Sequence, residues 1–210
     1  MEKRAFGLDG LEIRRGENAT TVRGYAAMFG RMSQPMGGFR EVIAPGSFAK
    51  SLGEDIRALW QHDSKQVLGR TKAGTLALWE DVQGLGFELT PPDTQAGRDA
   101  LVLIARGDVD QMSFGFNVAQ GGDSWEAQDD GLLVRTLHEV RLVEISPVTF
   151  PAYLDTSVTV ARSETLDCAP EWVRRALAQG VDHISADGAR ARLRTLRRRV
   201  NYLRLRGLAV

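Results

Sequence analysis

The sequence predicts a mostly β fold of the α+β type: a small β-barrel flanked by helices and followed by a basic helical tail. Three observations predict it. Short alternating or β-branched segments, separated by turn residues, fill most of the first 162 residues. Helical apolar spacing is rare within that part of the chain. Beyond it, the sequence becomes helical and rich in arginine, so a barrel-like core with helices outside is expected.

The expected strands follow one another closely. They cover residues 11–14, 20–29, 39–43, 56–62, 67–71, 76–80, 85–89, 111–117, 132–146 and 158–161. Residues 63–65 are predicted to form a turn, residues 81–84 to close a hairpin, and residues 121–131 to form a polar loop.

Two short helices are expected among the strands. Ser47 is predicted to cap a helix that includes Phe48 and Leu52. A second helix, capped by Thr94 or Asp93, is predicted to run through residue 105 and to stop at Gly107.

The chain is expected to divide into a β-barrel domain, residues 1–162, and a helical arm, residues 163–210. The arm has ten arginines against five acidic residues, a net charge of +5, whereas residues 1–162 have a net charge of −5. Helices are predicted over residues 170–179 and 187–206. The charge reversal indicates that the two parts have different roles.

Composition excludes several classes of protein. The apolar fraction of 43% and the charged fraction of 26% are ordinary for a protein with a packed core. No stretch is apolar enough for a membrane span, and the N-terminus lacks a signal-peptide core. A single cysteine, Cys168, rules out an internal disulfide and indicates a reducing cytoplasm; with only three histidines, no zinc cluster is expected. We therefore expect no metal and no cofactor.

Ser113 is the first candidate for chemistry. It lies between alternating apolar residues in a predicted buried strand, where a serine either packs or serves as a nucleophile. A nucleophile needs a base, and His62 and His138 are the candidates outside the tail, which holds His183. If the 132–146 strand has no bulge, Glu144 shares the face of His138, and burial of its carboxylate requires a partner such as an imidazole.

Four segments in order resemble the prohead (procapsid maturation) serine proteases of HK97-type bacteriophages. They are FREVIAPGSF (residues 39–48), LWQHD with VLG (59–63 and 67–69), RGD leading to QMSFGF (106–108 and 111–116), and LVEISPVTFPA (142–152). The resemblance covers residues 20–162. It implies a fold similar to the herpesvirus assembly proteases, with Ser113 as nucleophile and His62 as general base. Glu144 is the favoured third member and His138 the alternative; Asp63, adjacent to His62 on a strand, is expected to face away.

The resemblance also implies a role. Such enzymes are hydrolases that cleave capsid proteins during virion maturation, so the expected substrate is the major capsid protein with its scaffold segment. The expected location is the interior of the viral procapsid, in the bacterial host cytoplasm. The arm would dock on the inner shell and could undergo self-cleavage, whereas DNA contact by residues 190–206 is the less favoured interpretation. The alternative function is a catalytically inactive β-barrel component of capsid assembly.

Overall fold

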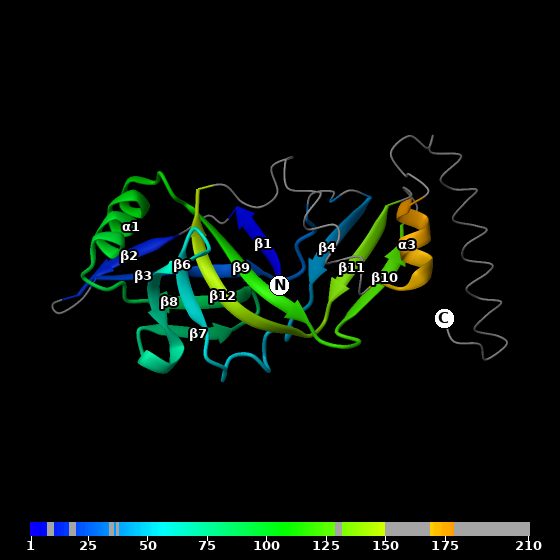
Figure 1. The fold of residues 1–210 in the computed structure, drawn as a ribbon, viewed down its shortest axis with the longest axis horizontal. Helices are drawn as coiled ribbons and strands as arrows, with labels where there is room; N and C mark the ends of the chain where they lie inside the picture. Colours follow the sequence, from blue (N-terminus) through cyan, green and yellow to red (C-terminus); the bar gives the residue numbers. More distant parts are fainter. Residues whose placement is uncertain are drawn as a thin grey trace.

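The computed structural model describes residues 1–7, 11–16, 20–33, 36, 38–128, 132–149 and 169–178. Their strands form three sheets (Figure 1). The five-stranded sheet has the order β1 (Glu2–Gly7), β9 (Gln111–Val118), β12 (Val140–Val148), β5 (Arg57–Trp60) and β6 (Asp63–Arg70). The four-stranded sheet has the order β2 (Glu12–Arg15), β3 (Thr20–Met28), β8 (Gly84–Leu89) and β7 (Leu76–Glu80). The three-stranded sheet has the order β10 (Asp123–Ala127), β11 (Leu133–Leu137) and β4 (Phe39–Ile43).

The mostly β class is confirmed, but the predicted barrel is wrong for the described part of the chain. All three sheets are open, because their edge strands do not pair with one another. A physical reason lies in the segment 132–146, predicted as a single strand. It breaks at His138 and Glu139, so that β11 enters the small sheet and β12 enters the five-stranded sheet. The chain thus changes sheets where a barrel strand would continue.

The main core lies where side chains of the five-stranded and four-stranded sheets meet. Alternate residues of β9, Met112, Phe114 and Phe116, are buried in it, beside Phe87 of β8. The Phe114 ring packs edge-on against Phe48, with centroids 5.3 Å apart. Because these alternate residues of β9 point into the core, the residues between them point to the opposite face of the sheet.

The helix α1 (Gln95–Arg106) confirms the second predicted helix. The Thr94 hydroxyl accepts a hydrogen bond from Gly97 N, which caps the first turn. Gly107 ends the helix with a φ of 80°, a left-handed conformation that favours glycine. Ala100 and Ile104 are buried against the main core.

The helix predicted after Ser47 does not form. Residues 45–53 instead make turns, because the backbone bonds run between residues three apart, as from Ser47 N to Ala44 O. The Ser47 hydroxyl does not cap a helix but donates to Leu137 O. The prediction for residues 121–131 also differs from the structure. This segment was predicted as a loop, but it contains strand β10, which pairs with β11. A short 3-10 turn, η1 (Thr71–Ala73), follows β6.

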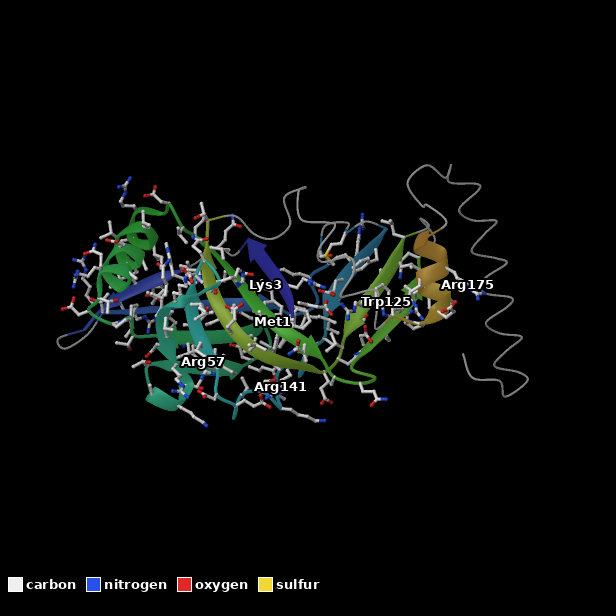
Figure 2. The ribbon with its side chains drawn as sticks, in the orientation of Figure 1. Met1, Lys3, Arg57, Trp125, Arg141 and Arg175 are labelled. Carbon is white, nitrogen blue, oxygen red and sulfur yellow. The ribbon has the colours of Figure 1, made fainter. Side chains whose placement is uncertain are left out.

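The helix α3 (Glu171–Ala178) lies against the small sheet at one end of the molecule (Figure 1). Its Val173 is buried in a second core with Trp125, Phe39 and Leu133, and Figure 2 shows Trp125 on the strand side of this contact. The helix predicted at 170–179 is therefore present. The helix predicted at 187–206, the strand at 158–161 and His183 lie outside the described residues. No helix of the described residues is long and apolar enough to cross a membrane.

A buried ionic cluster joins the N-terminal strand to the small sheet. It consists of Arg4 and Glu2 of β1, Glu41 of β4, Arg135 of β11 and Asp123 of β10. Arg135 is fully buried and bonds Glu2, Glu41 and Asp123 at 2.7 to 3.1 Å. Buried charges of this kind are tolerated only when paired. The cluster therefore fixes β1 against its neighbours.

Candidate active site

Strand β9 presents Ser113 and Gly115 on the face opposite the main core. Met112, Phe114 and Phe116 point into the core, so the alternation of the strand turns Ser113 and Gly115 the other way. Ser113 is nonetheless only 1% exposed.

Strand β12 brings two polar residues to the same face. It pairs with β9 antiparallel, with Ser146 opposite Ser113 and Glu144 opposite Gly115. The register shifts between Leu142 and Glu144, which is a β-bulge at Val143. Leu142 and Ile145 both reach the core because of this shift, and Glu144 leaves it.

The bulge corrects the face predicted for Glu144. Without it, Glu144 would share the face of Val140 and Leu142, as the uninterrupted strand predicted. The carboxylate is still buried, with 2% exposure, so the expectation that it needs a partner remains.

That partner is His62, which lies at the tip of the β5–β6 hairpin. Trp60 pairs with Asp63, so Gln61 and His62 form a two-residue turn; the predicted turn at 63–65 lies instead within β6. The φ angles of Gln61 and His62 are 54° and 62°. Two positive φ values are typical of a type I′ turn, for which Asn-Gly is the favoured pair. A glutamine and a histidine here carry backbone strain, which proteins retain mainly at functional sites.

Hydrogen bonds to β12 hold the strained turn in place. Gln61 N donates to Pro147 O at 3.2 Å, and the Gln61 side chain exchanges two bonds with Thr149, at 2.7 and 3.1 Å. His62 N donates to the Ser146 hydroxyl at 3.3 Å. The tip of the hairpin is thereby docked on the end of β12.

The base of the same hairpin is held by an ion pair. Arg70 donates to both carboxylate oxygens of Asp55, at 2.7 and 2.5 Å. The hydrogen bonds from Arg70 lower the pKa of Asp55 from 3.8 to about 2. His62 is therefore carried by a hairpin that is fixed at both ends.

The imidazole and the carboxylate meet directly. His62 Nδ1 lies 2.7 Å from Glu144 Oε1, and Glu144 Oε2 accepts a hydrogen bond from the Ser146 hydroxyl at 2.5 Å. Because a carboxylate only accepts, His62 Nδ1 carries the proton and Nε2 of the neutral ring is left as a base.

Gly115 makes room for this carboxylate. A Cβ atom on Gly115 would lie 2.5 Å from Glu144 Oε1 and 3.2 Å from its Cδ. Any side chain at this position would displace Glu144 from His62. The glycine two residues after Ser113 is thus explained by close approach.

Ser113 faces the other neighbouring strand. Its hydroxyl donates to Arg4 O of β1 at 2.8 Å. No hydrogen bond between Ser113 and His62 is found among the described residues. The structure therefore places Ser113 and the His62–Glu144 pair on one sheet face without a direct bond between them.

The other candidates lie elsewhere or serve the fold. His138 is exposed and contacts the Ser124 hydroxyl at 2.8 Å, away from His62. Hydrogen bonds from Gln66 and from Lys65 N lower the pKa of Asp63 and occupy its carboxylate. Phe116 is fully buried in the core, where it packs.

Two parts of the site were not predicted from the sequence. Ser146 is one; its spacing of two from Glu144 on a strand placed the pair on one face and could have indicated it. The clamp between Gln61 and Thr149 is the other, and no sequence signal marks it. Among the described residues, no three His, Cys, Asp or Glu side chains are grouped to hold a metal ion.

The sequence and the fold were compared with those of known proteins. The profile of a family described as caudovirus prohead serine protease matches residues 9–169. A search among curated proteins gave no match. A solved structure of the bacteriophage T4 capsid assembly protease is similar over 70% of this chain and 99% of that chain, at 11% identity and a TM-score of 0.45.

Proposed function

The chain belongs to the caudovirus prohead serine protease family, and we propose that Ser113 is its nucleophile, His62 its general base and Glu144 the acid that orients His62. Membership makes the chain a serine protease of phage capsid maturation. What we propose beyond the family is the role of each residue, the substrate and the place of action.

One observation carries the proposal: the 2.7 Å contact between His62 Nδ1 and Glu144 Oε1. It joins a nearly buried carboxylate to a histidine held in a strained turn, on the sheet face that also presents Ser113. A base oriented by an acid, beside a hydroxyl, is the arrangement that serine acylation requires. Within the described part of the chain, His138 contacts the Ser124 hydroxyl and makes no contact of this kind with His62, which supports Glu144 over it as the third member.

The mechanism follows from these positions. His62 Nε2 takes the Ser113 proton as the hydroxyl oxygen attacks a peptide carbonyl, and the amine leaves with that proton. Glu144 accepts from His62 Nδ1–H throughout, which fixes the tautomer and stabilises the imidazolium. Water then hydrolyses the acyl-enzyme with His62 again as base.

Attack requires the Ser113 hydroxyl to change its partner. It donates to Arg4 O in this structure, and in the acylation step it must donate to His62 Nε2 instead. Contacts of a catalytic serine are often loose before substrate binds, so this geometry is compatible with the role.

We propose the major capsid protein and its scaffold segment as substrates, cleaved inside the procapsid in the bacterial cytoplasm. The arm of residues 163–210, with its net charge of +5, is proposed to dock the enzyme on the scaffold or inner shell. Deletion of residues 179–210 is expected to reduce incorporation of the protease into proheads. Unchanged incorporation would remove the proposed docking role.

The test of the catalytic roles is co-expression with the cognate capsid protein. Wild type is expected to shorten the capsid protein, and Ser113→Ala is expected to leave it at full length. A fluorophosphonate probe on the purified chain should label the wild type at Ser113, as read by peptide mass spectrometry. Capsid processing that survives Ser113→Ala would refute the assignment.

Ser124→Ala is the matched control, because it removes the hydroxyl that contacts His138. It is expected to retain processing and labelling. A wild-type chain that neither processes the capsid protein nor reacts with the probe would instead support the inactive assembly component.

A further inference from the structure

We infer that Ser146 is a positioning residue that holds His62 and Glu144 in register, an inference that rests on the function proposed for those two residues. Ser146 is fully buried on β12. Its hydroxyl donates to Glu144 Oε2 at 2.5 Å and accepts from His62 N at 3.3 Å. A single hydroxyl thus contacts both members of the acid–base pair.

The hydrogen-bonding capacity of serine matches this position. A hydroxyl has one proton to donate and lone pairs to accept, and here the proton goes to the acid and a lone pair receives the backbone of the base. Glu144 Oε2 is thereby satisfied, which leaves Oε1 for His62 Nδ1. Removal of the hydroxyl would leave a buried carboxylate oxygen without this donor, and such a group reorients or draws in water.

The second contact acts on the backbone of the base. His62 has a φ of 62°, a conformation that needs support from its surroundings. The Ser146 hydroxyl supplies the acceptor for the His62 N–H, while Gln61 is held by Pro147 and Thr149. Ser146 therefore fixes the direction in which the imidazole leaves the turn.

Ser146 is not a second nucleophile. Its proton is donated to Glu144, and the contacts of the described residues place its hydroxyl against the His62 backbone rather than the ring. Ser113, directly opposite in the register, donates to β1 instead. Two facing serines thus take different roles because their hydroxyls point to different strands.

The test compares Ser146→Ala with Ser51→Ala in the full-length chain. Ser51 is also buried and also bonds β12, donating to Val140 O and accepting from Leu142 N, both at 2.8 to 2.9 Å, but it contacts neither His62 nor Glu144. Loss of a hydrogen bond to a charged group predicts about a tenfold slower phosphonylation of Ser113 by a fluorophosphonate in Ser146→Ala. Ser51→Ala is expected to react at the wild-type rate with a similar loss of thermal stability.

A spectroscopic signature separates positioning from stability. The downfield proton resonance of His62 Nδ1–H is expected to broaden or vanish in Ser146→Ala and to remain in Ser51→Ala. Ser146→Thr, which keeps the hydroxyl, is expected to restore both the resonance and most of the rate. If Ser146→Ala is too unstable to measure, a resonance lost in Ser146→Thr overturns the inference.

Different results would refute the proposed function and the positioning role of Ser146. If the probe still labels the chain after Ser113→Ala or His62→Gln, the proposed function is wrong. If those variants are unreactive but Ser146→Ala reacts like wild type and keeps the resonance, the function stands and the role of Ser146 is overturned.

Discussion

The two sides of the candidate site are built differently. On the β12 side, His62, Glu144 and Ser146 are joined by hydrogen bonds of 2.5 to 3.3 Å, and the hairpin that carries His62 is held at both ends. On the β9 side, Ser113 is bonded to the backbone of β1, which the buried ionic cluster fixes in place. In the proposed mechanism, the acid and base are therefore assembled in advance, whereas the Ser113 hydroxyl has still to engage them.

This difference indicates where control of the reaction resides. The parts that need accurate orientation are rigid, which is how preorganised sites lower a barrier. In the proposed mechanism, the group that must exchange a hydrogen bond during attack is the Ser113 hydroxyl. Variants on the two sides of the site should therefore differ in their effects on reaction rate and on stability.

The largest effect is expected from Glu144→Gln. The amide has nearly the shape of the carboxylate, but it cannot stabilise the imidazolium and favours the wrong tautomer of His62. The rate of Ser113 phosphonylation by a fluorophosphonate should fall on the order of 10⁴-fold, with little change in the unfolding midpoint. His138→Gln is the control and should react like wild type; the reverse result would make His138 the third member.

The next largest effect is expected on the free energy of unfolding rather than on the reaction rate. Arg135→Met removes one of the two cations that pair with the buried Glu2 and Glu41, and also the partner of the partly buried Asp123. Loss of one partner in a buried ion pair costs about 3–5 kcal/mol. Urea unfolding measures this loss. Arg141→Met removes an exposed pair with Glu54 and should cost less than about 1 kcal/mol. Equal losses in the two variants would contradict a special role of the cluster in fixing β1.

Gly115→Ala is expected to displace the Glu144 carboxylate while leaving Glu144 itself unchanged. The added Cβ would lie 2.5 Å from Glu144 Oε1 and push the carboxylate away from His62. A shift of this size should slow phosphonylation of Ser113 by the fluorophosphonate roughly 100-fold. Gly53→Ala, where a Cβ meets nothing within 4 Å, is the matched control and should leave the rate unchanged. A wild-type rate in Gly115→Ala would show that the carboxylate tolerates displacement.

The smallest effect is a pH dependence of stability at the base of the hairpin. The pKa of Asp55 is lowered from 3.8 to about 2 in the folded protein, so its contribution is full above about pH 4 and is lost as the pH falls toward 2. Asp55→Asn should therefore flatten the fall in unfolding midpoint over this window. Arg70→Gln removes the main partner but leaves Arg57 Nη2 at 3.2 Å from the same carboxylate, so it should flatten the curve less than Asp55→Asn does. A flattening by Arg70→Gln that is absent in Asp55→Asn would show that another group titrates in this window.

The sequence predicted the regular elements better than the irregular ones. Helix α1, with its Thr94 cap and Gly107 stop, carries its signals locally, as does the hairpin of β7 and β8. The turn at Gln61 and His62 was missed because a Gln-His pair is not among the residue pairs that signal a type I′ turn. The bulge at Val143 has no local signal, and it reverses the face of Glu144. The long strand was divided because two sheets compete for it, which only tertiary pairing decides.

The candidate site was predicted mainly through family resemblance. Periodicity could place Ser113 on a buried strand and indicate that Glu144 needs a partner, but it left two histidines open. The contact between His62 and Glu144 depends on a left-handed turn and a bulge, neither of which a regular pattern contains. Ser146 was missed because its spacing of two from Glu144 places the pair on one strand face but does not by itself separate positioning from packing.

The left-handed turn also bears on how this protein can evolve or be engineered. Asparagine and glycine at positions 61 and 62 would relieve the strain of the hairpin, so selection for stability alone would replace the histidine. Activity and stability therefore compete at one residue. A stabilised chain designed from turn preferences would fold well and would have lost the proposed base.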